Sequence, residues 1–205
     1  MKTRWIWLSL LSLMVLLSAC SEPKANPTRA NNEGKKQLII QPLKLTEKEK
    51  LLISKTNTRD IKFFELNGSK RQEEQLVVDV IAYHNGKESE FHHATADIPS
   101  DFQGEILSFG ISAEVEKQAP LLLTGVPGGL VTSPILTVPT SSMLVANITK
   151  PVELHKNKPV YIAYWLGTSK NHLSDTNHEG AFPEEVKEVE SAYVYKITLV
   201  ESKTK

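Results

Sequence analysis

The chain has 205 residues with 24 basic and 24 acidic side chains, so its formal net charge is zero. A near-neutral chain lacks the clustered basic excess with which nucleic-acid-binding proteins hold phosphates, and we expect no nucleic-acid partner. The single cysteine excludes an internal disulfide, and the length suits one domain.

The first 19 residues have the pattern of a secretory signal. Lys2 and Arg4 precede an uncharged apolar run at 5–17. A run of about 13 residues is too short for a comfortable membrane-spanning helix, which needs about 20, but it fits the apolar core of a signal peptide. We therefore expect residues 1–19 to be removed, which would leave a net charge of −2.

Residues 17–20 read LSAC, with small residues before a lone cysteine. This motif resembles the lipobox of bacterial lipoproteins, whose cysteine receives a diacylglyceryl group before a peptidase cuts in front of it. The resemblance covers residues 1–20 only. It implies that Cys20 is lipidated and that its partner is membrane lipid. Two acyl chains hold a protein firmly on a bilayer, whereas one binds reversibly.

The same resemblance implies a location in the cell envelope, outside the cytoplasm. Ser21 follows the cysteine, and in this position the chain resembles lipoproteins that two-membrane bacteria forward to the outer membrane. In a single-membrane cell the protein would stay on the outer face of the plasma membrane, and both locations remain open. Residues 21–36 have no large apolar side chain, which predicts a disordered tether after Cys20. Residues 37–205 are then expected to form a single domain.

A short helix is predicted near the start of that domain. Thr46 followed by Glu49 has the spacing of a capping box, in which the side chain of each residue accepts a hydrogen bond from the backbone N–H of the other. We expect a helix over 47–55 with Leu51 and Leu52 as its buried residues.

The remaining pattern is that of β-strands. Residues 75–84 are apolar on both alternating faces, which favours a central strand. The Asn-Gly pair at 85–86 suits a type I′ hairpin turn, and the charged residues 87–95 suit an edge strand. A second Asn-Gly pair at 67–68 is interpreted as the end of a strand. The other predicted strands are 38–40, 61–66, 105–113, 143–148, 160–166 and 192–200.

Seven or eight short strands separated by Asn, Gly and Pro predict a mainly β fold, an antiparallel β-sandwich with one or two short helices. The second helix would lie near 183–190. The run 182–190, rich in glutamate, is interpreted as a solvated helical face.

Residues 118–149 carry no charged side chain. Four prolines and three glycines in this segment exclude a membrane-spanning helix. Two interpretations remain: buried strands joined by turns, or an apolar loop that contacts a partner or the bilayer surface. The candidate partner-binding residues of this segment are Leu121, Leu122, Leu123, Val126 and Leu130.

Three aromatic residues extend this candidate partner surface. Tyr161, Tyr164 and Trp165 lie on a predicted strand, and tyrosine and tryptophan are enriched at binding hot spots. The alternative is that at least two of the three pack in the core.

Residues 171–180 hold two imidazoles and two carboxylates. A transition-metal site, such as a zinc site, would use His172, Asp175 and His178, whose spacing of three would align them on a helix. The stretch is rich in Ser, Asp, Asn and Gly, which favour turns, so a solvated polar loop is the alternative.

Calcium is the second metal considered for this loop. Asp175, Asn177 and Glu179 match the opening of an EF-hand loop, with glutamate in place of the third Asp or Asn. An EF-hand would place a bidentate glutamate at its twelfth position, where this chain has Val186. A looser calcium site with oxygen ligands remains possible.

Motifs of established catalytic sites are missing from the sequence: there is no H-E-x-x-H, no P-loop and no complete nucleophile elbow. We therefore expect a lipid-anchored, non-enzymatic binding or accessory module whose partner is an envelope protein, an envelope polymer or a small ligand. The alternatives are a metal-dependent envelope hydrolase that uses the 172–179 loop and a calcium-stabilised structural module. No cofactor is expected unless calcium or zinc binds there.

Overall fold

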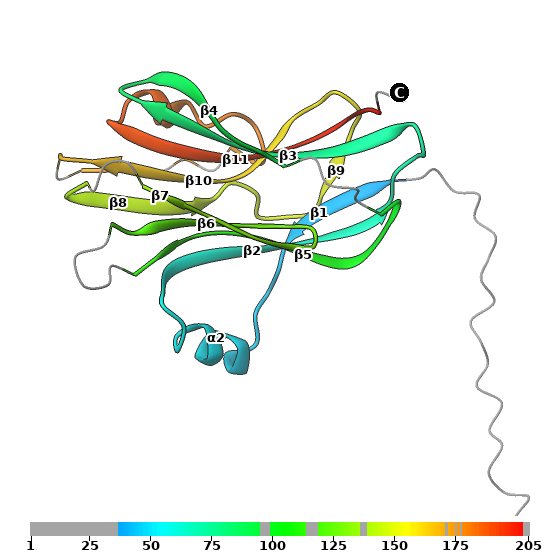
Figure 1. Ribbon diagram of the computed structural model, residues 1–205, viewed down its shortest axis with the longest axis horizontal. Coiled ribbons are helices and arrows are strands. Elements are labelled where there is room, and N and C mark those ends of the chain that lie inside the picture. The colour runs from blue at the N-terminus through cyan, green and yellow to red at the C-terminus, as the bar shows by residue number, and fades with distance from the viewer. Residues whose placement is uncertain are drawn as a thin grey trace, which may run out of the picture. The chain divides into compact units, whose positions relative to one another are not determined.

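Strands form most of the part of the chain that the computed structural model describes. That part comprises residues 37–94, 99–113, 119–135, 139–170, 172–174, 176 and 178–202, without the side chains of 90–94. It belongs to one compact unit, Lys36–Lys205, in which two antiparallel sheets face each other (Figure 1). The predicted mainly β sandwich is confirmed. The predicted signal peptide, Cys20 and the tether lie outside the described residues.

The two sheets are called sheet A and sheet B. Sheet A has six strands in the order β7-β6-β5-β2-β1-β9: Leu38–Pro42 (β1), Thr58–Ser69 (β2), Asp101–Ser112 (β5), Leu121–Val126 (β6), Gly129–Pro134 (β7) and Val152–Leu154 (β9). Sheet B has five strands in the order β4-β3-β11-β10-β8: Glu74–His84 (β3), Lys87–Ala94 (β4), Ser141–Ala146 (β8), Val160–Thr168 (β10) and Ser191–Glu201 (β11).

The position of β3 explains why both of its faces are apolar. It lies between the edge strand β4 and β11, as the sequence predicts for a strand without a polar face. Val78 and Val80 point into the core between the sheets. Ile81 and Tyr83 belong to a second apolar cluster, on the outer face of sheet B. Sheet B is therefore buried on both faces near β3.

The two Asn-Gly pairs have different roles. At 85–86 the φ angles are 49° and 73°, and the pair joins β3 to β4 as the predicted hairpin turn. At 67–68 the prediction of a strand end is wrong, because β2 continues to Ser69 through an irregularity in its register. Gly68 has φ 107°, and a Cβ atom there would lie 1.9 Å from the carbonyl oxygen of Gln37. Glycine is required here by a β-bulge rather than by a turn.

The uncharged segment 118–149 consists mainly of strands. It contains β6, β7 and β8, and β6 pairs with β7 around a tight turn in which Gly128 has φ 84°. The interpretation of this segment as strands joined by turns is therefore confirmed for β6, β7 and β8, although not all of their residues are buried. The described residues hold eleven strands rather than seven or eight, because the sequence pattern gave no bounds for β6 and β7 and did not predict the short β9.

The helix α2 (Glu47–Ile53) forms with the predicted capping box, since the Thr46 side chain accepts a hydrogen bond from the Glu49 N–H and Glu49 accepts one from the Thr46 N–H. The expected burial of Leu51 and Leu52 is wrong, because each is 59% exposed. The sequence pattern correctly placed the helix start, but the helix lies on the side of sheet A that faces away from sheet B (Figure 1). There both leucines remain exposed to solvent.

The second predicted helix is one 3₁₀ turn, η1 (Glu184–Lys187). It is not a fully solvated face, because Val186 is buried. Within the described ranges, no helix has the length and apolar character needed to cross a bilayer.

Candidate functional site

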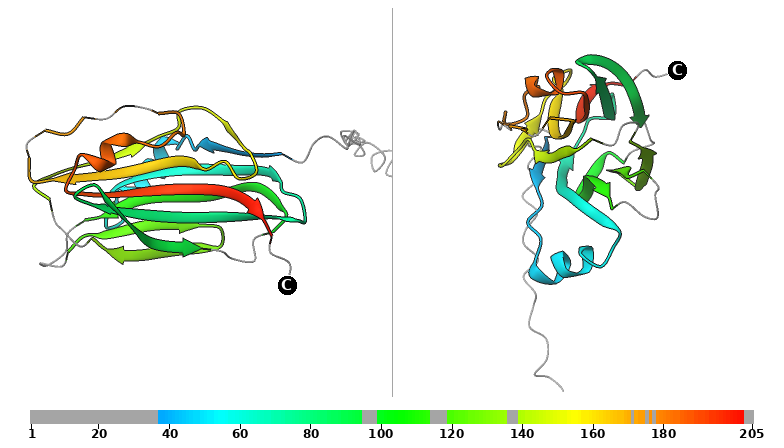
Figure 2. Two further views of the ribbon diagram at one scale, coloured as in Figure 1. Left: turned by 90° about the horizontal axis from the view of Figure 1, so that it is seen from above. Right: turned by 90° about the vertical axis from the view of Figure 1, so that its left-hand side faces the viewer.

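The chain between β10 and β11 forms a cover over the outer face of sheet B. We call the described residues between 169 and 190 the cover segment; it contains η1, which lies on the viewer's side of sheet B in the left-hand view of Figure 2. Val186 packs on Tyr164 and Val194 of the sheet. Phe182 contacts Tyr83 and Tyr161, with ring centroids 5.9 and 5.3 Å away. These apolar contacts hold the cover segment, which contains the predicted metal-site residues, against the outer face of sheet B.

Asn147, at the end of β8, fastens the cover segment and is itself fully buried. Its side-chain amide donates to the carbonyl oxygens of Tyr161 and Ala181, both at 2.8 Å. Its Oδ1 atom accepts from the backbone N–H of His178 at 3.1 Å, and its carbonyl oxygen accepts from Gly180 N–H at 2.8 Å. One asparagine thus satisfies backbone groups on both the strand and the cover segment.

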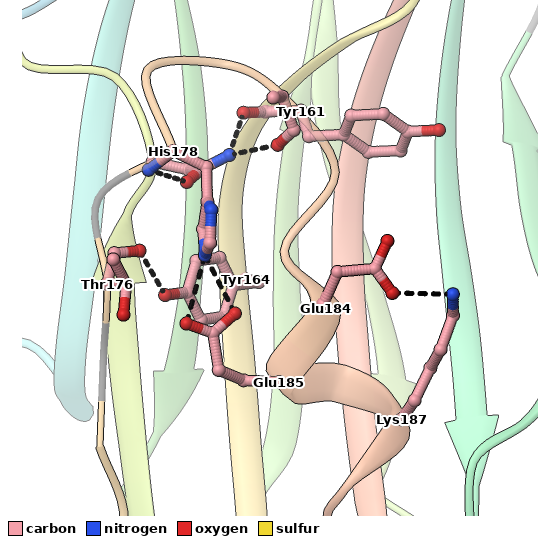
Figure 3. Close-up of polar contacts among 9 residues, drawn as sticks. Tyr161, Tyr164, Thr176, His178, Glu184, Glu185 and Lys187 are labelled. Carbon is pink, nitrogen blue, oxygen red and sulfur yellow. Dashed lines mark hydrogen bonds and ion pairs between the residues drawn. The ribbon is translucent and has the colours of Figure 1, made fainter.

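His178 and Glu185 form a close polar pair inside this arrangement (Figure 3). His178 Nε2 lies 2.9 Å from Glu185 Oε1 and 2.7 Å from Oε2. The two side chains are only 22% and 16% exposed. Next to them, the Tyr164 hydroxyl donates to the carbonyl oxygen of Thr176 at 3.1 Å. The pair therefore joins the middle of the cover segment to η1.

The environment of Glu185 favours its ionised form. Burial raises the pKa of its carboxyl, but hydrogen bonds from its own backbone N–H and from His178 and Thr176 outweigh burial, so the pKa lies below the ordinary 4.5. An imidazole–carboxylate pair is also the second half of a catalytic triad, whose other ring nitrogen contacts a nucleophile. Among the described residues, the ring contacts of His178 are those of its Nε2 atom to the Glu185 carboxylate, which link two parts of the cover segment.

We predict that replacing Glu185 with glutamine lowers the free energy of unfolding by about 1–2 kcal/mol at pH 7, since a hydrogen bond loses its charged acceptor. A carboxyl whose pKa falls on folding stabilises the native state above its unfolded pKa, and that contribution disappears as pH falls through the folded pKa. The difference between the native chain and the variant should therefore shrink below pH 4.5. Urea unfolding followed at pH 3.5 to 7 measures it, and a difference that stays constant across this range contradicts the prediction.

The structure does not bring the described metal candidates together. His172 is exposed, His178 contacts Glu185, and Glu179 accepts a hydrogen bond from Thr149 and lies 3.9 Å from Lys150. Within the described residues, no three His, Cys, Asp or Glu side chains form a group that could hold a metal ion. Asp175 and Asn177 lie outside the described residues, and the zinc or calcium site stays a prediction.

The three aromatic candidates belong mostly to the interior. Tyr164 and Trp165 are buried, one in the outer cluster of sheet B and the other in the core between the sheets. Tyr161 is half-buried beside Phe182. The core-packing interpretation therefore holds for two of the three, which offer no surface to a partner.

The apolar candidates of β6 and β7 divide between the two faces of sheet A. Leu122 is buried in the core, and Leu123 and Val126 are half-buried. Leu121 and Leu130 are 38% and 59% exposed. The segment is thus neither wholly buried nor a free loop: its inward residues fill the core and its outward residues remain in solvent.

Ile106 on β5 joins these exposed residues. It is 52% exposed, because its neighbours Leu107 and Phe109 alternate with it and point into the core. We call Ile106, Leu121 and Leu130 the apolar outer face of sheet A. The sequence analysis did not identify Ile106 as a candidate. The alternation in its strand was a usable signal, because assigning Leu107 and Phe109 to the core places Ile106 on the opposite face.

A cavity of about 220 Å³ opens between the sheets where β2 lies near β8. Trp165 is the one predicted site residue that lines it. Asp60 at this cavity forms an ion pair with Lys62 at 3.3 Å, so its charge is already compensated. The remaining lining residues are Arg59, Ile111, Ser142, Met143 and Leu144.

Comparison with known proteins gave no relative: no protein-family model matches the chain, and no match was found among curated proteins or solved structures. Arguments about function therefore depend on the residues themselves.

Proposed function

We propose that this protein is a bacterial lipoprotein, anchored through a diacylglyceryl group on Cys20 to the extracytoplasmic face of a membrane, where its β-sandwich binds a partner protein of the envelope. The observation that carries the location is the sequence LSAC at 17–20, directly after an apolar run that two cations precede. Two acyl chains on one sulfur would hold the domain at the bilayer.

A binding role agrees best with the surface of the domain. The apolar outer face of sheet A exposes three large aliphatic side chains to water. Covering them with a partner would remove apolar surface from water, which is favourable. The most developed polar cluster, around His178 and Glu185, instead closes a contact within the protein. We therefore propose a module that binds through sheet A and catalyses no reaction.

Replacing Cys20 with alanine should abolish incorporation of fatty acid into the protein, since the thiol is the acceptor. The signal should then stay attached, because cleavage in front of the cysteine follows its lipidation in this class of protein. Metabolic labelling with a fatty-acid analogue and the mass of the N-terminal peptide measure both effects. The matched control is Asn26→Ala, which leaves the thiol in place. Undiminished labelling of the alanine variant would disprove the anchor.

Binding through sheet A predicts a crosslink in living cells. A photoreactive amino acid in place of Leu130 should give a discrete larger product on a gel, whereas the same amino acid at exposed Glu188, beside η1, should not. Changing both Ile106 and Leu121 to serine should weaken the Leu130 product several-fold, since buried apolar area drives association. Equal products from positions 130 and 188 would contradict a binding surface on sheet A.

A further inference from the structure

The exposed large apolar residues of the described chain are confined to one side of the molecule. They are Leu51 and Leu52 on α2 together with the apolar outer face of sheet A. Figure 1 and the right-hand view of Figure 2 agree that α2 lies on the outer side of that sheet, away from sheet B. The opposite side, where the cover segment lies, exposes no large apolar side chain among the described residues. This asymmetry indicates an oriented interaction.

The helix α2 is held by its own cap rather than by packing. None of its seven residues is buried, and the Thr46–Glu49 capping box closes its first turn. Helices this short are marginal in water and ordinarily derive stability from an apolar face packed on something else. The leucine pair at 51–52 therefore lacks a partner within the described part of the protein.

Lysines flank this leucine pair. Lys48 lies three and four residues before the leucines, which is the spacing of neighbours on one helical face, and Lys55 follows in the turn directly after the helix. Lys44 precedes the helix, and all three lysines are exposed without an ion pair to any described residue.

The two acids of α2 offset part of this charge, because residues 44–55 hold four lysines and two glutamates and keep a net charge of +2. Glu47 forms an ion pair with Lys50 at 2.7 Å, and the Glu49 carboxylate is bound to the Thr46 N–H and hydroxyl. Basic residues around exposed leucines are the composition of segments that lie in the interface of an anionic bilayer.

We infer that α2 docks on the surface of an anionic bilayer, with Leu51 and Leu52 in the interface and Lys44, Lys48 and Lys55 at the lipid headgroups. This inference rests on the proposed anchor at Cys20. A fully extended chain from Cys20 to Leu38 spans at most about 60 Å, so the anchor keeps α2 within reach of the lipid. Such tethering makes docking intramolecular, and a weak contact then suffices.

A fluorophore at position 52 tests the inference, because Cys20 is the only cysteine and its sulfur would carry lipid. The lipidated full chain with Leu52→Cys is labelled with a polarity-sensitive dye and reconstituted in vesicles of neutral phosphatidylcholine, or of phosphatidylcholine with phosphatidylglycerol. The matched control is Glu188→Cys, an exposed position beside η1.

In anionic vesicles the dye at position 52 should shift to shorter wavelength and be quenched by lipid-borne nitroxide, while the dye at 188 should do neither. Adding Lys48→Gln and Lys55→Gln should lower the ratio of docked to undocked protein by roughly 25-fold, because each basic residue near an anionic surface contributes about fivefold. Raised salt should act in the same direction.

Three results would overturn docking. If the chain floats with the vesicles but the dye at 52 behaves like that at 188, the anchor stands and docking fails. If the shift at 52 occurs without vesicles, a second copy of the chain covers α2 instead of lipid. If the chain acquires no lipid and floats with neither vesicle, both the anchor and the docking that rests on it fail.

Discussion

Replacing Asn147 with alanine should lower the free energy of unfolding by about 3 kcal/mol or more. The change removes both side-chain hydrogen bonds to Tyr161 and Ala181 and the acceptor of the His178 N–H. Each buried polar group left without a partner costs about 1–3 kcal/mol. Because two of the three groups belong to the cover segment, this segment should open before the sheets do.

Chemical denaturation gives the stability change, and hydrogen exchange shows where it acts. We expect faster exchange of the backbone amides at 178–186 and unchanged exchange in β2 and β5. The control is Asn57→Ala, since Asn57 is an exposed asparagine of the β1–β2 connection and its backbone carbonyl, which accepts from Ala113, is retained. A loss below 1 kcal/mol for the Asn147 variant would mean that Asn147 does not fasten the cover.

Removing the Tyr195 side chain should have the other large effect, about 3–5 kcal/mol for Tyr195→Ala, the usual range for truncating a large buried aromatic residue. Tyr195 is fully buried on β11, and its ring stacks on Phe109 of sheet A with centroids 5.4 Å apart. Its hydroxyl donates to the carbonyl oxygen of Gly125 at 2.6 Å. The same residue therefore joins the two sheets by an apolar and a polar contact.

Tyr195→Phe separates these two contacts. Phenylalanine keeps the stacked ring but leaves the Gly125 carbonyl without the hydroxyl, so we expect a loss of about 1–3 kcal/mol. The matched control is Tyr161→Phe, because Tyr161 is half-buried and its hydroxyl makes no hydrogen bond to the residues drawn in Figure 3. Thermal unfolding of the three variants orders them, and a phenylalanine variant as stable as the native chain would show that the bond between the sheets contributes nothing.

Burial also acts on the ionisation of this residue. Because the Tyr195 hydroxyl is removed from water, its pKa is raised well above its ordinary value, and the neutral form that donates the hydrogen bond is present at neutral pH. The contact between the sheets is therefore insensitive to physiological pH, and the contribution of Glu185 is expected to fall only below pH 4.5.

Local sequence patterns predicted those elements whose cause is local. The capping box at Thr46 and Glu49 set the start of α2, and the Asn-Gly pair at 85–86 set a hairpin, because both depend on the backbone geometry of a few consecutive residues. Alternation of apolar residues likewise predicted β3 as an inner strand and β4 as an edge strand.

The errors arose where the same local signal serves different tertiary contexts. The Asn-Gly pair at 67–68 marks a β-bulge rather than a turn, since the backbone of Gln37 approaches Gly68 from another part of the chain. The leucines of α2 fit a buried helical face in the sequence, but the path of the β1–β2 connection places the helix outside the sandwich.

The candidate site was predicted in part. The sequence singled out His178 but grouped it with its near neighbours, whereas the structure pairs it with Glu185 of η1. Asn147 was missed, because nothing in its local sequence distinguishes it, and its partners lie 14 to 34 residues further along the chain.

The sequence by itself determined the class of fold and the prediction of a lipid anchor, since strand alternation and the LSAC motif are written in consecutive residues. The tertiary structure alone decided which apolar residues remain in solvent and which polar groups meet beneath the cover segment. Periodicity assigns a side chain to one of two faces, but only the packing of distant strands decides whether that face meets another layer or water.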